Sequence, residues 1–66
     1  MFNRELLQKK MDELGLSQYD LAAKVVTSQP MIAGIILGYK QPSFALAARI
    51  AAAVGCKIDD FVKKEE

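Results

Sequence analysis

The sequence contains no histidine, no tryptophan and only one cysteine. A single cysteine cannot form an internal disulfide, and a chain without histidine lacks the residues of a Cys/His zinc cluster or of histidine-based catalysis. The usual supports of small secreted domains are therefore excluded. We expect a protein of a reducing, cytoplasmic compartment, with no metal and no cofactor.

Long apolar runs and an excess of charge of one sign are also missing. No segment reaches the ~18 uncharged residues of a membrane span, and the N-terminus, MFNRELLQKK, does not read as a signal peptide. Nine basic and eight acidic residues give a net charge of +1, which is weak for a nucleic-acid binder. However, four acidic residues lie in the last eight positions, so residues 1–58 hold seven basic and four acidic groups.

What the sequence does have is a hydrophobic content of 52% arranged at helical spacing. A chain of 66 residues buries only about 60% of the surface of its unfolded form, so nearly all of its apolar residues must form one core in a single domain, 1–66. Capping residues and glycine stops predict helices at about 4–14, 18–26, 29–37, 44–54 and 58–63. The expected fold class is all-α, a compact bundle of five short helices. In the first helix, Leu6, Leu7, Met11 and Leu14 should be core residues.

The region around residues 17–37 contains two short helices separated by a tight break. Ser17 and Ser28 are suited to cap them, because a serine oxygen accepts from the free N–H groups of a first turn. Two short amphipathic helices joined by a few residues must cross steeply to bury both apolar stripes, which is the helix-turn-helix geometry. This pattern predicts DNA binding.

Four segments carry a family resemblance: GLSQYDLA, the helix from Ser28 to Ile35, GYKQPS and AARIAAAVGCKIDDFV. Over nearly its whole length the sequence resembles the phage repressor and Cro-like helix-turn-helix family, also called the Xre family. The resemblance implies a lambda-repressor-like fold in a phage or bacterial transcriptional regulator, Cro-like or a repressor, that is cytoplasmic and associated with the nucleoid. It also implies a homodimer on double-stranded DNA with the third helix in the major groove.

The resemblance assigns roles to particular residues. Gln18 matches a glutamine that touches the phosphate backbone and braces the recognition helix, and Gln29 matches a base-reading position. Lys40 and Ser43, with the amide end of the fourth helix, match positions that clamp the backbone. The full set of expected DNA-binding residues is Gln18, Ser28, Gln29, Pro30, Ala33, Gly34, Lys40 and Ser43. Each of the glutamines, and Lys40, could instead be an ordinary solvated residue.

The third helix departs from the family pattern at its exposed positions. Where relatives carry polar or charged residues, this chain has Pro30, Ala33, Gly34 and Leu37. Thymine methyl groups could be packed by Pro30, Ala33 and Leu37. Gly34 could let the backbone of the helix approach the groove closely. Discrimination by apolar contact is weak, so Gln29 is left as the main base reader.

Two further departures concern the turn and the core. Val26 stands where the turn usually holds glycine, and a left-handed backbone is costly for a β-branched residue, so a reshaped turn is expected. Met11 and Ile36 occupy positions where many relatives pair an arginine with a glutamate. Replacing both partners of a half-buried ion pair by apolar side chains costs little, which predicts that Met11 and Ile36 touch in the core.

Two interaction surfaces are predicted besides the third helix. Phe44, Ile58 and Val62 exceed what one small core can enclose, so they are expected at the homodimer interface. Leu37 and Tyr39 offer exposed apolar surface, which supports an alternative function as a protein-interaction module, antirepressor-like or antitoxin-like. An enzyme is not expected. No catalytic residues are assigned.

Overall fold

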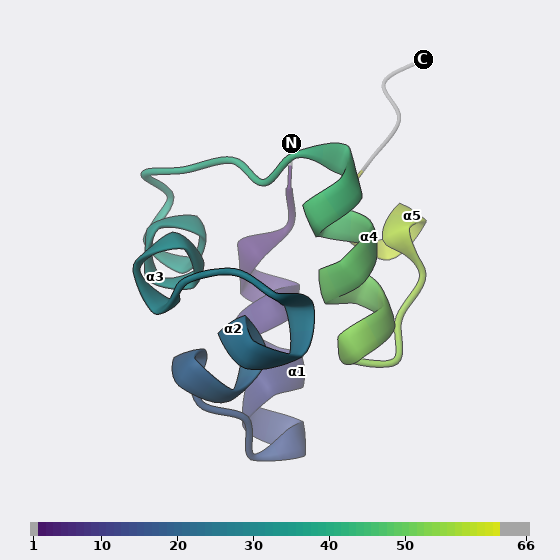
Figure 1. Cartoon of the computed structure of the whole chain (residues 1–66). Coiled ribbons are helices and arrows are strands. Elements are labelled where there is room, and N and C mark those ends of the chain that lie inside the picture. Colours follow the sequence, from purple (N-terminus) through teal and green to yellow (C-terminus); the bar gives the residue numbers. More distant parts are fainter. Residues whose placement is uncertain (1, 63–66) are drawn as a thin grey trace.

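The computed structural model describes residues 2–62 and contains five helices in that range. They are α1 (Arg4–Leu14), α2 (Gln18–Val25), α3 (Gln29–Leu37), α4 (Phe44–Ala53) and α5 (Ile58–Phe61). Helix α1 packs on α3 and α5, α2 packs on α3 and α4, and α4 packs on α5 (Figure 1). The described residues form no strand, only an isolated bridge between Phe2 and Val62. The predicted all-α bundle is confirmed.

Four helices begin at a side-chain cap of the same kind. The side-chain oxygens of Asn3, Ser17, Ser28 and Ser43 each accept a hydrogen bond from the N–H three residues further on, at 3.0–3.2 Å. Each cap satisfies one of the N–H groups that a first turn leaves without a partner. The helix starts predicted from the sequence are therefore correct.

The start of α2 is reinforced by a reciprocal bond. The N–H of Ser17 donates to the carboxylate of Asp20 at 3.0 Å, which completes a capping box. This bond, followed by a hydrogen bond from the Ser17 side chain to the same carboxylate, holds the pKa of the Asp20 carboxyl below its ordinary value. Asp20 therefore carries a negative charge at neutral pH.

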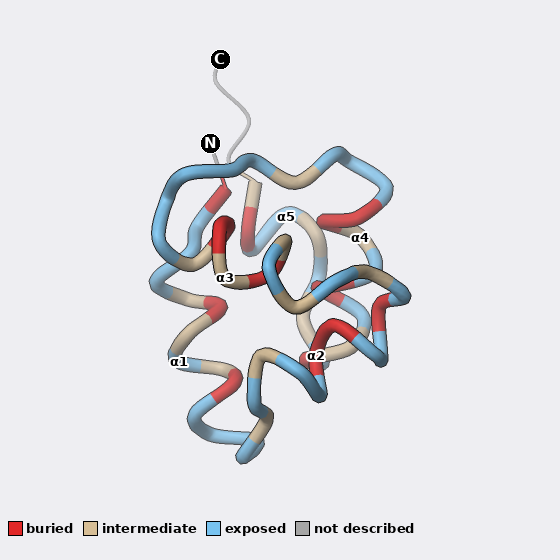
Figure 2. The backbone as a smooth tube through the Cα atoms, turned by 60° about the vertical axis from the view of Figure 1, so that its left-hand side comes forward, coloured by how far each residue is buried: buried red, intermediate tan, exposed pale blue. Residues whose placement is uncertain are grey.

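The core runs through the middle of the bundle and draws on every helix (Figure 2). Its buried residues are Phe2, Leu7, Met11, Leu21, Ala22, Val25, Ile32, Ile35, Leu46, Ala47, Ile50, Ala51, Val54 and Phe61. The side chains of Leu6 and Ile36 are half-buried and pack against this cluster. No buried side-chain nitrogen or oxygen of the described residues lacks a partner, so the interior carries no unpaired polar cost.

Leu14 is not a core residue, contrary to the sequence prediction, because 53% of its side chain is exposed. The reason lies in how α1 ends. The N–H of Leu16 donates to the carbonyl of Met11 at 2.9 Å, and that of Gly15 to Asp12 at 3.3 Å. This is a Schellman motif, whose apolar contact is made by the residue after the glycine. Leu16 accordingly packs against the core in place of Leu14.

Four helices end in this same motif, and one of them does so without glycine. The left-handed position holds a glycine after α1, α3 and α4, but after α2 it holds Val26, with φ 58° and ψ 58°. The N–H of Thr27 donates to the carbonyl of Ala22 at 2.9 Å, as the motif requires. The sequence predicted a reshaped turn, and this prediction is wrong, because the turn keeps the usual hydrogen bonds of the motif. Instead, Val26 adopts the backbone conformation of a glycine, which costs an L-residue roughly 1–2 kcal/mol.

Val26→Gly is expected to stabilise the fold by about 1 kcal/mol, because relief of the left-handed strain outweighs the extra flexibility of glycine in the unfolded chain. In a domain of this size that corresponds to a rise in Tm of about 4–8 °C, measured by thermal unfolding. Val26→Ala serves as the control, since it removes the β-branch but keeps a Cβ in the left-handed position. A Tm for Val26→Gly no higher than that of Val26→Ala would contradict this account.

The two ends of the described chain are fastened together. The rings of Phe2 and Phe61 are stacked with centroids 5.2 Å apart, and the N–H of Asn3 donates to the carbonyl of Phe61 at 2.7 Å. Helix α5 is a single turn, and the N–H of Lys57 that precedes it donates to Asp60 at 3.0 Å. The predicted end of this helix at residue 63 lies outside the described residues, within which it ends at Phe61. The last helix thus closes the bundle over the N-terminal segment.

Among residues 2–62, no single helix has both the length and the apolar character that crossing a membrane requires. Only α2 and α3 taken together, across the sharp bend between them, reach that length and composition.

Candidate nucleic-acid interface

Helices α2 and α3 form a steeply crossed pair. Only residues 26–28 separate them, and their directions differ by 114°. Leu21 and Val25 of α2 and Ile32 and Ile35 of α3 are all buried, so the crossing closes over the core. This steep crossing is the helix-turn-helix geometry, and it turns the opposite side of α3 outward.

The first residues of α2 and α3 are joined by a hydrogen bond between side chains. Nε2 of Gln29 donates to Oε1 of Gln18 at 2.7 Å, and both side chains are half-buried. The bond restricts the rotamers of Gln29, so less conformational entropy is lost if its amide binds a ligand. Gln18 is therefore bonded to the first residue of α3, and its role as a brace of a recognition helix stays a prediction.

The amide groups keep unused hydrogen-bonding capacity beyond this bond. Oε1 of Gln29 and the second hydrogen on its Nε2 remain, and they form the acceptor–donor pair that matches N6 and N7 of adenine. Both hydrogens on Nε2 of Gln18 also remain, and they suit a phosphate oxygen. One linked pair of side chains can therefore serve the backbone and a base edge together.

The outward stripe of α3, which we call the α3 surface, consists of Gln29, Pro30, Ala33 and Leu37. These positions follow one another at steps of one, three and four residues and so lie on one side of the helix. Pro30 and Leu37 are exposed, and Gln29 and Ala33 are half-buried. Apart from the glutamine, the surface offers only apolar contacts, as the sequence predicted.

Ser28 and Ser43 have structural duties that restrict what else they can do. Oγ of Ser28 caps α3 and Oγ of Ser43 caps α4, each by accepting an N–H of the first turn. Each hydroxyl keeps its own hydrogen as a donor. At the start of α4, the N–H groups of Phe44 and Ala45 precede the first intrahelical donor, so this end of the helix can receive an anion.

Gly34 has a different role from the one predicted. It is buried, and its carbonyl accepts the N–H of Tyr39 at 2.8 Å and that of Lys40 at 3.1 Å. A Cβ on Gly34 would lie 2.9 Å from Cγ and Cδ of Lys40, so the lysine stem occupies the space that the glycine leaves. Gly34 therefore does not expose backbone to a groove. It lets the stem of Lys40 lie close against α3.

Charged groups are few around the α3 surface. The segments 17–20, 28–30 and 38–44, which flank it, contain only two charged residues, Asp20 and Lys40. One more cation approaches from α1, because the guanidinium of Arg4 lies against the α-carbon of Gly38 at the end of α3. The sequence did not predict this contact of Arg4, because nothing in the spacing of residues indicates that the first helix meets the end of the third. Both cations lie toward the loop after α3, and the start of α2 has none.

The remaining predicted residues are placed as follows. Phe44 is exposed, whereas Ile58 and Val62 are half-buried and pack partly on the core of their own chain. Leu37 and Tyr39 are both exposed. Within residues 2–62 there is no group of three or more metal-ligating side chains.

These features define a helix-turn-helix domain: α2 and α3 cross steeply from capped starts, a polar pair joins their first residues, and Lys40 of the following loop lies against α3. A family model described as Helix-turn-helix, of the Xre/Cro-like type, matches residues 7–61, and the chain belongs to this family. The protein is therefore a DNA-binding helix-turn-helix regulator. No match was found among curated proteins.

Proposed function

We propose that this protein is a sequence-specific transcriptional regulator of the Cro/repressor type that binds operator DNA as a homodimer. Each subunit places α3 in the major groove, with Gln29 on a base edge and Gln18 on a phosphate. Lys40 and the start of α4 at Ser43 hold the backbone on the other side. Such a regulator acts in the cytoplasm, at the nucleoid.

The observation that carries this proposal is the 2.7 Å bond between Gln29 and Gln18. A solvated surface glutamine would gain little from being held in one rotamer, because ordering a side chain costs entropy. A base reader gains from it, because a bidentate contact requires the amide at a fixed position. The bond therefore supports Gln29 as the residue that selects a base, and the apolar rest of the α3 surface as shape complementarity.

The homodimer is proposed to form through Phe44, with Ile58 and Val62 at its margin. Phe44 leaves a large ring in water, which is unfavourable unless a partner covers it. A two-fold dimer should then set its two α3 helices about 34 Å apart, one turn of DNA. Sedimentation equilibrium is expected to show a dimer, and Phe44→Ser to shift it toward monomer. A wild-type monomer at millimolar concentration, with and without DNA, would contradict the homodimer.

Gln29→Ala and Lys40→Ala are expected to weaken DNA binding in different ways. Loss of Gln29 should cost about 1–3 kcal/mol on the preferred site and relax the preference at one position of each half-site. Loss of Lys40 should weaken binding to all sequences alike and reduce the salt slope by about one per subunit, because a phosphate contact releases a counterion without reading a base. Fluorescence anisotropy with a duplex library at two salt concentrations measures both.

If Gln29→Ala lowers the affinity for every sequence equally, base reading at this position is wrong and specificity comes from DNA shape instead. The exposed side chains of Leu37 and Tyr39 support the second candidate, a protein-interaction module on the same fold. That function would be favoured if both glutamine and lysine variants left DNA affinity unchanged while Leu37→Asp abolished binding to a protein partner.

A further inference from the structure

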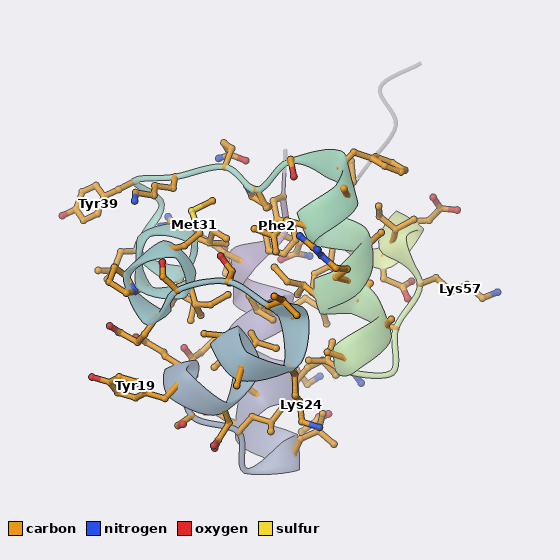
Figure 3. All side chains as sticks on the ribbon, viewed as in Figure 1. Phe2, Tyr19, Lys24, Met31, Tyr39 and Lys57 are labelled. Atoms are coloured by element: carbon orange, nitrogen blue, oxygen red, sulfur yellow. The ribbon has the colours of Figure 1, made fainter. Side chains whose placement is uncertain are left out.

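Two tyrosines lie on either side of the α3 surface, and neither side chain packs into the core. Tyr19, in the first turn of α2, is 71% exposed, and Tyr39, in the loop after α3, is 84% exposed. In Figure 3 both side chains project from the left-hand side of the molecule, Tyr39 above α3 and Tyr19 below it. Neither hydroxyl makes a hydrogen bond with another described residue. The family assignment does not account for them.

We propose that the hydroxyls of Tyr19 and Tyr39 are phosphate contacts that position α3 in the major groove, one from each side. This inference rests on the proposed DNA-binding function and extends it to residues that the sequence did not single out for DNA. The sequence offers Tyr39 only for the alternative function, as a possible contact with a protein partner, and assigns no role to Tyr19.

The charged groups around α3 are unevenly distributed. Positioning on DNA requires contacts to phosphates on both sides of the groove, and lysine and arginine usually supply them. Here the cations near α3 are Lys40 and Arg4, both toward the loop, while the start of α2 carries the negative charge of Asp20. A neutral donor on a long side chain can reach a phosphate there without a cation. Tyr19 lies one residue from Asp20 and is such a donor.

Both tyrosine rings are largely exposed to solvent. A tyrosine ring that stays in water contributes no burial free energy to folding. At an interface, a tyrosine combines apolar contact area with one hydroxyl donor and loses little conformational entropy on binding. The backbone under each ring is already fixed, by the capping box at Ser17 and Asp20 and by the bond from Tyr39 N–H to Gly34 at 2.8 Å. Both hydroxyls therefore extend from anchored positions beside a helix that reads bases.

Phosphate contacts by neutral groups have a particular salt signature. A cation that binds phosphate releases counterions and steepens the dependence of affinity on salt, whereas a hydroxyl gives affinity without that release. The protein should therefore bind DNA with a shallow salt slope for its affinity, in keeping with its net charge of +1.

The test compares Tyr19→Phe, Tyr39→Phe and Lys40→Ala with the wild-type protein on one preferred duplex and one random duplex at several salt concentrations. Each Tyr→Phe change removes one oxygen and keeps the ring. We expect each to weaken binding to both duplexes by roughly tenfold, from one hydrogen bond lost in each subunit, with the salt slope and Tm unchanged. Lys40→Ala should lower the affinity and also the slope.

In one outcome, the wild-type protein binds DNA and both Tyr→Phe variants bind it with affinities within twofold of the wild-type affinity. That result would overturn the tyrosine contacts and leave the proposed function standing. A changed salt slope in either variant would also overturn them, because a hydroxyl carries no charge. Wild-type protein that binds neither duplex would overturn the proposed function and this inference together. Loss of binding to a protein partner in Tyr39→Phe, with DNA affinity intact, would assign Tyr39 to that partner instead.

Discussion

Phe61→Ala is expected to remove about 3–5 kcal/mol from the free energy of unfolding, which is most of the stability of the domain. Phe61 has no exposed surface, its ring stacks on Phe2, and its carbonyl accepts the N–H of Asn3. Truncation leaves a cavity beneath a one-turn helix in which Phe61 is the one fully buried side chain, since Ile58 is only half-buried. Urea unfolding followed by circular dichroism should show a much lower midpoint or a protein that is partly unfolded without urea.

Phe44→Ala is the matched control for this experiment. It makes the same chemical change on a ring that is 73% exposed, so at micromolar concentration the free energy of unfolding should change by less than about 0.5 kcal/mol. If Phe61→Ala costs no more than Phe44→Ala, the role of α5 as the element that closes the bundle is wrong.

Met11→Arg is expected to cost about 3–5 kcal/mol alone, because the side chain is only 2% exposed and the new charge would have no partner. Ile36→Glu should cost somewhat less, since position 36 is half-buried and the carboxylate keeps part of its hydration. Helices α1 and α3 pack together, so the two new charges should meet. The double variant is therefore expected to recover much of the loss.

A double-mutant cycle by urea unfolding measures the coupling, which should exceed about 1 kcal/mol. Met11→Arg combined with Leu37→Glu is the control, because Leu37 is exposed on the α3 surface and should not couple to position 11. Equal coupling in the two cycles would remove the interpretation of Met11 and Ile36 as the apolar replacement of an ion pair.

Local sequence signals predicted the fold well because the helices begin and end by local chemistry. Asn3 and the serines at 17, 28 and 43 each cap their own helix, and such caps need no knowledge of distant contacts. Leu14 was assigned wrongly to the core for the complementary reason. Its periodicity fits the buried face, but the Schellman motif gives the packing position to Leu16.

The site was less predictable, because its details depend on contacts between segments that are distant in the sequence. The glutamine at each helix start could be identified from the pattern, but their bond depends on the crossing of α2 and α3. The sequence suggested that Gly34 leaves its backbone open to a DNA groove. In the structure the side-chain stem of Lys40 occupies that space. Val26 shows that a strong local penalty can be accepted where tertiary packing fixes the turn.

Titration of the wild-type protein with a labelled random-sequence duplex and with a sequence selected from a library, each at two salt concentrations, tests the central claim most directly. We expect binding to the random duplex that weakens with salt, and tighter binding to a selected site that contains an adenine at a fixed position in each of two half-sites about 34 Å apart. The absence of binding to either duplex at both salt concentrations would contradict the account of this protein as a regulator that reads DNA through α3.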